Sequence, residues 1–296
     1  MILSMTGFGR GVAQSELMKI TVEVKSLNSK QLDLMMRVPS AMRELEAPLR
    51  NLMARDLERG KVELSLTAEE IGPESASVVD SEVMCRYRQE ILQASEKLGI
   101  APPNDWWSLL LRMPEAVKSS HRELTEADID LCYGAVGEAI GALTSFRIAE
   151  GKKLYSFFVE KIKEIGDLLE EIEPMEQERV PKIRLRLEEH LSRLDTIEYD
   201  RGRLEQEMIL YIEKLDVTEE KTRLRSHLSY FLDTLGAPDG DRLPSGQGKK
   251  LGFIAQEMGR EINTLGSKSN HAGMQQTVVR MKDVLEQIKE QVLNVL

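Results

Sequence analysis

Apolar and polar residues alternate through much of the first 70 positions of the chain. Ile20, Val22 and Val24, for example, are separated by polar residues, and a period of two is typical of strands with one buried face. Four segments of this part are expected strands: residues 4–13, 19–27, 32–36 and 62–66. Before the last of them, Ser40 is expected to cap a helix over residues 41–57. The pattern therefore predicts a small mixed sheet with one helix.

A helical spacing replaces this alternation after a loop that is rich in Gly, Pro and Ser. Helices are expected through Cys85–Leu98 and from Trp106-Trp107, where packing of the two indole rings is the alternative to stacking on bases. Residues 129–215 are highly charged and helical, which predicts an antiparallel arm. Pro174 and Pro181 are expected to break this arm, because proline lacks the N–H that a helix interior requires.

The last part of the chain predicts three helices that pack as a bundle. They are residues 218–235, 249–266 and 270–296. Asp216-Val217-Thr218-Glu219 has the form of a capping box before the first, and Ser269-Asn270 is expected to cap the third. The fold class is therefore α+β. The expected parts are an N-terminal domain over 1–145 (sheet in 1–70, helices in 80–145), a long helical arm over 146–215 and a C-terminal helical domain over 216–296.

Glycines at positions 7, 9 and 11 fall in the first expected strand. A Gly-rich run of this kind lets a backbone approach a phosphate, but no helix start follows it, so a dinucleotide site is disfavoured. We expect a bulged or edge strand instead.

Charge is unevenly distributed along the chain, although its formal total is −10. Residues 1–70 carry ten basic and ten acidic side chains, residues 71–241 carry 22 and 35, and residues 242–296 carry eight and five. The acidic excess therefore lies in the middle. A phosphate-rich partner is expected to meet the two ends of the chain brought together, because a local basic surface is what phosphate binding requires.

Cysteine content and hydropathy indicate the cellular environment. The sequence contains only Cys85 and Cys132, with no CxxC or Cys/His grouping, so neither a disulfide framework nor a structural zinc site is expected. The first residues lack a secretory pattern and no segment reaches 18 apolar residues. We expect a cytoplasmic protein that makes no membrane contact.

The stretch 256–268 concentrates the chemistry of the chain. Its apolar residues form one stripe at spacings of three and four: Leu251, Ile254, Met258, Ile262 and Leu265. Glu257 and Glu261 lie four apart beside that stripe, and Lys268 joins them if the helix continues past Gly266. Paired carboxylates beside basic side chains suit a metal-and-phosphate site. The alternative is a solvated helix face with salt links to Arg260.

A second helix, 218–235, carries a comparable face. Glu220, Arg223 and His227 recur on it at spacings of three and four, and imidazole is a common general acid, general base or metal ligand near neutral pH. Side-by-side packing of the two helices is expected to bring Glu220 and His227 near Glu257 and Glu261.

Basic and amide side chains gather at the strand ends and turns of residues 1–70. They are Arg10, Lys25, Asn28, Lys30, Arg37, Arg59 and Lys61. We expect some of them to form a rim that contacts phosphates, with an ordinary solvated surface as the alternative. Arg147, Glu150 and Gly151, at the base of the arm, are further candidates for a role where the arm meets the body.

Several of these motifs occur together in one known family. They are Ser4-Met5-Thr6-Gly7-Phe8-Gly9-Arg10, Glu23–Lys30, Arg59-Gly60-Lys61, Glu219-Glu220 with Arg223-Leu224 and Ser226-His227, and Gln256-Glu257 with Arg260–Thr264 and Ser267-Lys268. In them the chain resembles the YicC/YloC family from end to end. The resemblance implies a divalent-metal-dependent endoribonuclease, assembled as a hexameric ring with a central cavity, in which the arm serves subunit contacts or clamp movement.

The resemblance also implies roles for individual positions. The acidic and histidine positions of the family fall on Asp216, Glu219, Glu220, His227, Glu257 and Glu261. Its RNA-facing positions fall on Arg10, Lys25, Arg37, Arg223, Arg260 and Lys268, to which we add Asn28.

These positions lead to an expected mechanism. We expect Glu257 and Glu261, with Glu220 or Asp216, to hold Mn²⁺ or Mg²⁺, and His227 to carry a proton. Small regulatory or structured RNA is the expected substrate, and other RNA-decay proteins are expected partners. The alternative is an oligomeric RNA-binding or adaptor protein without catalytic activity, in which Glu257 and Glu261 pair with Arg across a subunit contact.

Overall fold

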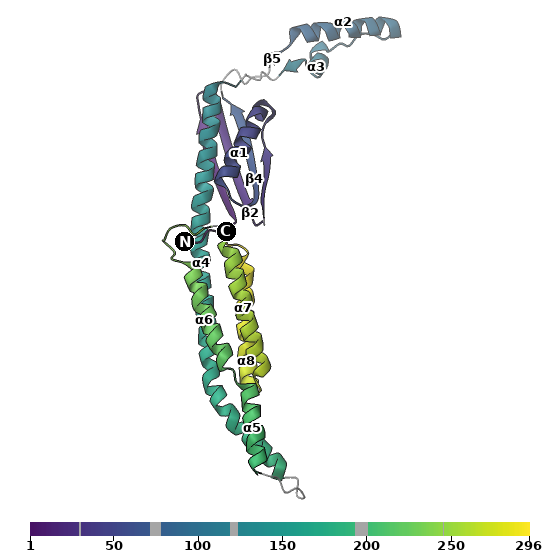
Figure 1. The fold of residues 1–296 in the computed structure, drawn as a ribbon. Coiled ribbons are helices and arrows are strands. Elements are labelled where there is room, and N and C mark those ends of the chain that lie inside the picture. The colour runs from purple at the N-terminus through teal and green to yellow at the C-terminus, as the bar shows by residue number, and fades with distance from the viewer. Residues whose placement is uncertain (30, 72–77, 119–123, 193–200, 245) are drawn as a thin grey trace.

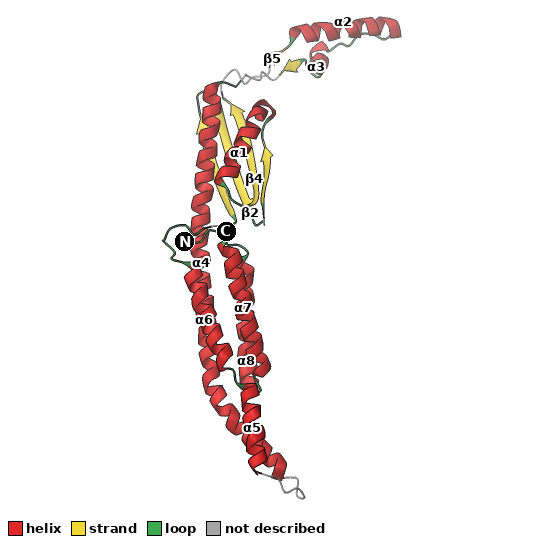
Figure 2. Cartoon of the chain, in the orientation of Figure 1, coloured by secondary structure: helices red, strands yellow, loops and turns green. Residues whose placement is uncertain are grey.

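The computed structural model describes residues 1–29, 31–71, 78–118, 124–192, 201–244 and 246–296. A four-stranded sheet lies toward one end of an elongated molecule, and a helical bundle extends from it (Figures 1 and 2). The predicted α+β class is confirmed. Among the described residues, no helix is both long enough and apolar enough to cross a membrane.

The sheet has the strand order β1-β2-β4-β3. Its strands are β1 (Gly7–Gln14), β2 (Met18–Leu27), β3 (Leu32–Arg37) and β4 (Gly60–Glu70). Antiparallel pairing joins β1 to β2 and β2 to β4, whereas β3 runs parallel to β4. All four predicted strands are therefore present. A crossover between β3 and β4 supplies the expected helix, as a 3₁₀ segment η1 (Ser40–Leu45) followed by α1 (Glu46–Asp56).

The expected cap at Ser40 is wrong. Ser40 is the first residue of the 3₁₀ segment, Pro39 precedes it, and no side chain caps this end. The backbone of Met42 also departs from helical angles, which separates η1 from α1. Pro39 lacks an N–H and holds an extended conformation, so the chain turns into the helix without a side-chain acceptor.

One face of the sheet is covered and the other is open. Ile20, Val22 and Val24 point into a core that also contains residues of α1 and of the long helix α4 (Glu126–Ser192). The opposite side chains of the same strands are exposed or half-buried. A sheet that is mainly antiparallel tolerates this arrangement because one of its faces can remain in water.

Glycines in β1 allow α4 to lie directly against the strand. A Cβ atom on Gly9 would overlap the backbone carbonyl of Ala139, and one on Gly11 would overlap that of Ala135. The prediction of an edge strand is confirmed, since β1 is the outer strand of the sheet. The reason for the glycines is close helix packing and involves no ligand.

Helix α4 extends from the sheet into the bundle without interruption. It is 67 residues long and contains Pro174 and Pro181, so the predicted breaks are wrong. Each proline removes one backbone hydrogen bond, but residues such as Phe158 and Ile172 of α4 are fully buried in the bundle core. This packing holds the helix together across its weak points. The predicted domain boundary at residue 145 stays a prediction, and α4 crosses that position.

Four further helices complete the bundle and the arm. They are α5 (Arg201–Leu215), α6 (Thr218–Leu235), α7 (Gln247–Lys268) and α8 (Ala272–Val292). The apolar stripe of α7 is buried as predicted: Leu251, Ile254, Met258, Ile262 and Leu265. The expected cap of the last helix is wrong, because His271 accepts a hydrogen bond from the Met274 N–H through Nδ1 at 3.4 Å. Its extended backbone places the imidazole over the first turn.

Both ends of the chain meet where the sheet joins the bundle (Figure 1). Ser4 and Val295 form an isolated bridge. Buried Arg147 of α4 donates to Ser26 Oγ at 2.6 Å and to the Met5 carbonyl at 3.3 Å, so it ties a strand end and the N-terminal segment to the helix. Burial lowers the pKa of Arg147, and the nearby Arg242 lowers it further. Of the three candidates at the base of the arm, Arg147 therefore has a structural role.

A small unit follows the sheet in sequence. It comprises β5 (Val78–Val79), α2 (Ser81–Leu98), α3 (Trp106–Leu110) and β6 (Val117–Lys118). Its core consists of Met84, Leu110 and Ala116, with Trp106 packed against them. This supports a packing role for Trp106, whereas Trp107 is 70% exposed.

We predict that Gly9→Ala destabilises the protein by about 3 kcal/mol, because the added methyl group meets the backbone of α4 and nothing there can rotate away. Gly137→Ala is the matched control: it lies on α4 with open space around its Cβ, and is expected to stabilise by about 0.5–1 kcal/mol. Urea denaturation followed by circular dichroism measures both. Equal changes in the free energy of unfolding for the two variants would show that the packing of α4 does not depend on close contact with β1.

Candidate active site on helices α6 and α7

The two helices that carry the predicted site residues pack side by side. Lys268 at the end of α7 contacts Glu220 at the start of α6, and Lys250 near the start of α7 lies 5.0 Å from the ring centre of Tyr230, near the end of α6. The helices therefore run antiparallel. This confirms the prediction that α6 and α7 are neighbours, and it places the middle of α6, with His227, alongside the middle of α7.

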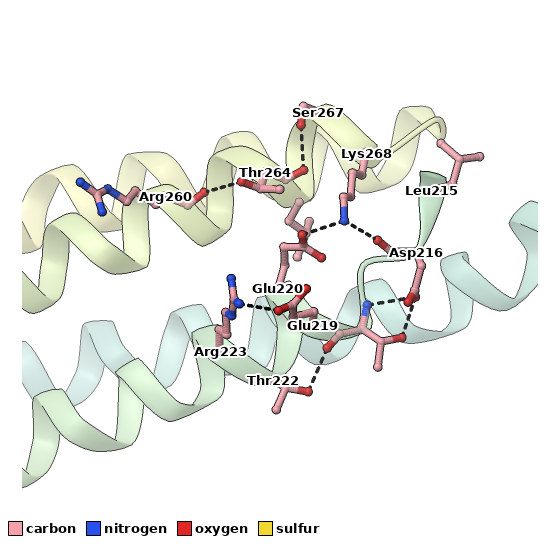
Figure 3. A network of polar contacts seen from close by, with 12 residues as sticks. Leu215, Asp216, Glu219, Glu220, Thr222, Arg223, Arg260, Thr264, Ser267 and Lys268 are labelled. Atoms are coloured by element: carbon pink, nitrogen blue, oxygen red, sulfur yellow. Dashed lines mark hydrogen bonds and ion pairs between the residues drawn. The ribbon is translucent and has the colours of Figure 1, made fainter. Parts of the chain in front are cut away.

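Glu220 and Lys268 form a buried ion pair (Figure 3). Glu220 is 5% exposed, and its Oε1 lies 2.8 Å from Nζ of Lys268. The same ammonium donates to the backbone carbonyl of Asp216 at 3.0 Å. The other carboxylate oxygen of Glu220, Oε2, is buried and has no hydrogen-bond partner among the described residues. One carboxylate oxygen of Glu220 is thus paired with a cation, and the other is buried without a hydrogen-bond donor among the described residues.

Arg179 strengthens the same region and had no role in the sequence prediction. Its guanidinium donates to the Leu215 carbonyl at 2.6 Å and to the Lys268 carbonyl at 3.4 Å, and the residue is 4% exposed. Arg179 and Lys268 therefore both hold the link between α5 and α6 against the end of α7. Nothing in the sequence distinguishes Arg179 from the many charged residues around it, because its burial depends on the tertiary packing of the arm.

Asp216 and Glu219 only partly form the predicted capping box. Asp216 accepts hydrogen bonds from the Thr218 hydroxyl at 2.7 Å and from the Thr218 N–H at 3.1 Å. These bonds, chiefly the one from the hydroxyl, lower the pKa of Asp216, and the charge of Lys268 adds to the effect. Glu219 pairs with Arg223 one turn along and does not reach back. Asp216 therefore forms a local turn with Thr218 just before the helix, and the N-cap residue is Val217, which has no side-chain cap.

The two carboxylates of α7 differ in their surroundings. Glu257 is half-buried and pairs with the exposed Arg260 at 3.0 Å, so the alternative of a helix face with salt links describes this residue correctly. Glu261 and His227 are both half-buried, and neither makes a hydrogen bond or ion pair with any described residue. These two side chains remain available for a ligand.

The proposed metal ligands do not form a cluster in this conformation. Within the part of the chain that the structure describes, no three His, Cys, Asp or Glu side chains lie close enough to hold a metal ion together. One reason is the register of the helices, because Glu220 lies level with Lys268, about two turns of α7 beyond Glu261 and three beyond Glu257. The other is local: Asp216 faces Thr218, Glu219 faces Arg223 and Glu220 faces Lys268. A metal would require at least one of these partners to be exchanged.

The basic residues predicted to contact RNA in the N-terminal part lie elsewhere. Arg10, Lys25 and Arg37 are on the open face of the sheet, where Lys25 lies 3.6 Å from Glu23 and Arg37 2.9 Å from Glu63. Asn28 donates to the Leu293 carbonyl at 2.6 Å, at the junction with the bundle. The chain ends meet, but the sheet and the Glu220 end of α6 lie on opposite sides of that junction (Figure 1). Lys30 lies outside the described residues.

Comparison with known proteins identifies the family. Residues 2–156 match the family model described as endoribonuclease YicC-like, N-terminal region, and residues 172–296 match the model of its C-terminal part. The chain is 32% identical over 302 residues to a probable endoribonuclease YicC of Clostridioides difficile, with 100% of both chains covered. It is 29% identical over 297 residues to the protein of that name from Haemophilus influenzae, with 99% of each chain covered. The chain therefore belongs to the YicC-like endoribonuclease family.

Proposed function

We propose that this protein cleaves phosphodiester bonds within RNA and uses a divalent metal ion, Mn²⁺ or Mg²⁺. Family membership along both parts of the chain supports the cleavage of RNA. The observation that carries the site is the antiparallel packing of α6 and α7, which sets the half-buried His227 alongside the stretch of α7 with Glu257 and Glu261. Small regulatory or structured RNA is the proposed substrate.

Glu257 and Glu261 are the proposed metal ligands on α7, with Glu220 or Asp216 as a third. Both of these lie at the level of Lys268, so either could join only after α6 shifts along α7. These carboxylates would hold the ion, which would supply positive charge against the developing charge on the phosphate. Carboxylate oxygens suit both Mn²⁺ and Mg²⁺. Because Glu220 is bound to Lys268, its use as a ligand requires that the ammonium moves away.

The remaining residues have proposed roles that their positions allow. His227 is the proton carrier, because its imidazole is half-buried and has no fixed partner among the described side chains. Arg223, Arg260 and Lys268 offset the phosphate charge. Each is engaged with a carboxylate in this structure, so RNA competes with Glu219, Glu257 and Glu220 for them.

The ends of the products distinguish two chemical routes. Attack by the neighbouring 2′-hydroxyl, with His227 as the base, breaks the bond to the 5′-oxygen and leaves a 2′,3′-cyclic phosphate upstream and a 5′-hydroxyl downstream. Attack by an activated water leaves a 5′-phosphate on the downstream fragment when the 3′-oxygen is the leaving group. Mass spectrometry of the cleaved RNA separates these outcomes.

We also propose that the protein works as a cytoplasmic homo-oligomer, a hexamer as the resemblance implies, with other RNA-decay proteins as partners. Large apolar side chains in and beside the small α2–α3 unit support association: Leu98 is 70% exposed, Ile100 63% and Trp107 70%.

The second candidate function is an RNA-binding adaptor without catalysis. In such an adaptor Glu257 and Glu261 pair with Arg across a subunit contact, whereas the Glu257–Arg260 pair of this structure lies within one helix.

We predict that Glu257→Gln and Glu261→Gln each lower the rate of RNA cleavage by about 100-fold or more, since each removes a negative charge from the proposed metal site. Folding and RNA binding should persist. The measurement is gel analysis of end-labelled RNA with EDTA and then with Mn²⁺ restored. Glu286→Gln, on the exposed surface of α8 and paired with Lys289, is the matched control and should keep full activity.

Full cleavage by both α7 variants would remove the site from this helix. Cleavage that EDTA leaves unchanged would exclude the metal but not the ribonuclease. A change in oligomer mass on Glu257→Ala, without any cleavage by the wild type, would support the adaptor.

We predict that Lys268→Met destabilises the protein, because it leaves the buried carboxylate of Glu220 without a cation. The Lys268 side chain is 32% exposed, so we expect the free energy of unfolding to fall by about 2–3 kcal/mol, less than for a fully buried pair. Lys289→Met, in an exposed pair with Glu286, should change it by no more than about 0.5 kcal/mol. Urea denaturation measures both. The double variant Glu220→Gln/Lys268→Met should recover part of the loss, and failure to do so would contradict the buried-pair account.

A further inference from the structure

The open face of the sheet presents side chains in rows that cross the strands. The register of the strands places Phe8, Lys25, Glu63 and Met35 in one row. Phe8 is 40% exposed and Met35 45%, although both are large apolar residues. Helices α1 and α4 contribute to the core on the other face, and no described element covers this one. The row therefore exposes apolar surface to solvent.

Phe8 borders a hollow at the end of this face nearest the bundle. The hollow has a volume of about 310 Å³ and is lined by Gly7, Phe8, Lys25, Ser26, Leu27, Lys61 and Glu63. Its size lies at the lower end of the range for small-ligand sites. Lys25 places its ammonium 6.0 Å from the centre of the Phe8 ring, so an aromatic face and a cation lie at one place.

Positive charge exceeds negative charge on this part of the face. The row of Phe8 and the two rows on either side of it carry four cations and three carboxylates. The cations are Arg10, Lys25, Arg37 and Lys61, and the carboxylates are Glu23, Asp33 and Glu63. Glu23 pairs with Lys25 and Glu63 with Arg37. Arg10 and Lys61 form no ion pair with any described residue, although Asp33 lies across from Lys61. On a chain of net charge −10, two uncommitted cations beside an exposed aromatic ring suit a polyanion with flat apolar groups.

We propose that this face binds an unpaired segment of the RNA substrate, with a base stacked on Phe8 and neighbouring phosphates on Lys25 and Lys61. The proposal rests on the proposed function, because it names the part of the RNA that the enzyme holds. A base within a duplex has both its faces covered by its neighbours, so the ring of Phe8 can stack only on a base that is unpaired or at a strand end. The surface therefore selects single-stranded regions.

A second copy of the chain is the other occupant to consider. Two copies that met face to face about a twofold axis would bring the same cations toward one another, because such a contact repeats one patch on both sides. The excess of positive charge opposes this arrangement and favours a phosphate backbone.

The test uses the full-length protein and short single-stranded RNA that carries 2-aminopurine, in EDTA so that no metal-dependent cleavage occurs. Stacking of this base on an aromatic ring quenches its fluorescence. Phe8→Ala and Phe8→Leu should each weaken binding by about tenfold and abolish the quenching, whereas Phe8→Trp should retain both. Phe8→Leu keeps apolar bulk, so it separates stacking from folding. Val12→Ala is the matched control: Val12 is on the same strand and face, is also 40% exposed, and should bind as the wild type does.

A blunt-ended RNA duplex of two fully paired strands, long enough that its ends contribute little, should bind the wild type and the Phe8 variants equally. Unchanged affinity and quenching in Phe8→Ala and Phe8→Leu would overturn the proposal. A change of oligomer mass in these variants, measured by light scattering with RNA absent, would also overturn it and assign the face to a contact between copies. If the wild type neither binds nor cleaves RNA, the proposed function itself fails. If the wild type cleaves RNA but the Phe8 variants bind it with unchanged affinity and quenching, only the stacking on Phe8 is excluded.

Discussion

The direct contact between helix α4 and strand β1 is the constraint on which the rest of the structure depends. Gly9 and Gly11 have no side chain to separate the two backbones, so the helix lies against the edge of the sheet. The same helix then supplies Phe158 and Ile172 to the core of the bundle. One element therefore belongs to both cores, and the close packing at these two glycines, together with the contacts of Arg147 and the chain ends, sets the position of the bundle relative to the sheet.

Local periodicity predicted the elements well, because each signal came from a few neighbouring residues. The alternation of Ile20, Val22 and Val24 and the apolar stripe of α7 could each be recognised because one face of the element is buried. The effect of the prolines of α4 was predicted wrongly because it depends on packing with residues far away in the sequence. Their local cost is real, but the apolar face of a helix that is buried over many turns outweighs it, and sequence windows contain no term for that packing.

The candidate site was predictable to the level of helix faces and no further. Spacing identified Glu220 with His227 and Glu257 with Glu261, and the antiparallel packing brought their helices together. The partners of these side chains depend on the relative level of α6 and α7 and on the end of the arm, which no spacing encodes. The pairing of Glu220 with Lys268, and the burial of Arg179 beside it, could therefore not be anticipated.

This pairing gives the proposed metal site a structural consequence. The ammonium of Lys268 neutralises Glu220 and also binds the carbonyl of Asp216 in the link between α5 and α6. A divalent ion that took Glu220 as a ligand would repel that ammonium, so binding of the ion would also release the carbonyl. Arg179 would then be the remaining side chain, among those described, whose hydrogen bonds join this link to the end of α7. The site and the link between α5 and α6 therefore share one lysine, and the free energy of exchanging its partners couples metal binding to the attachment of α5.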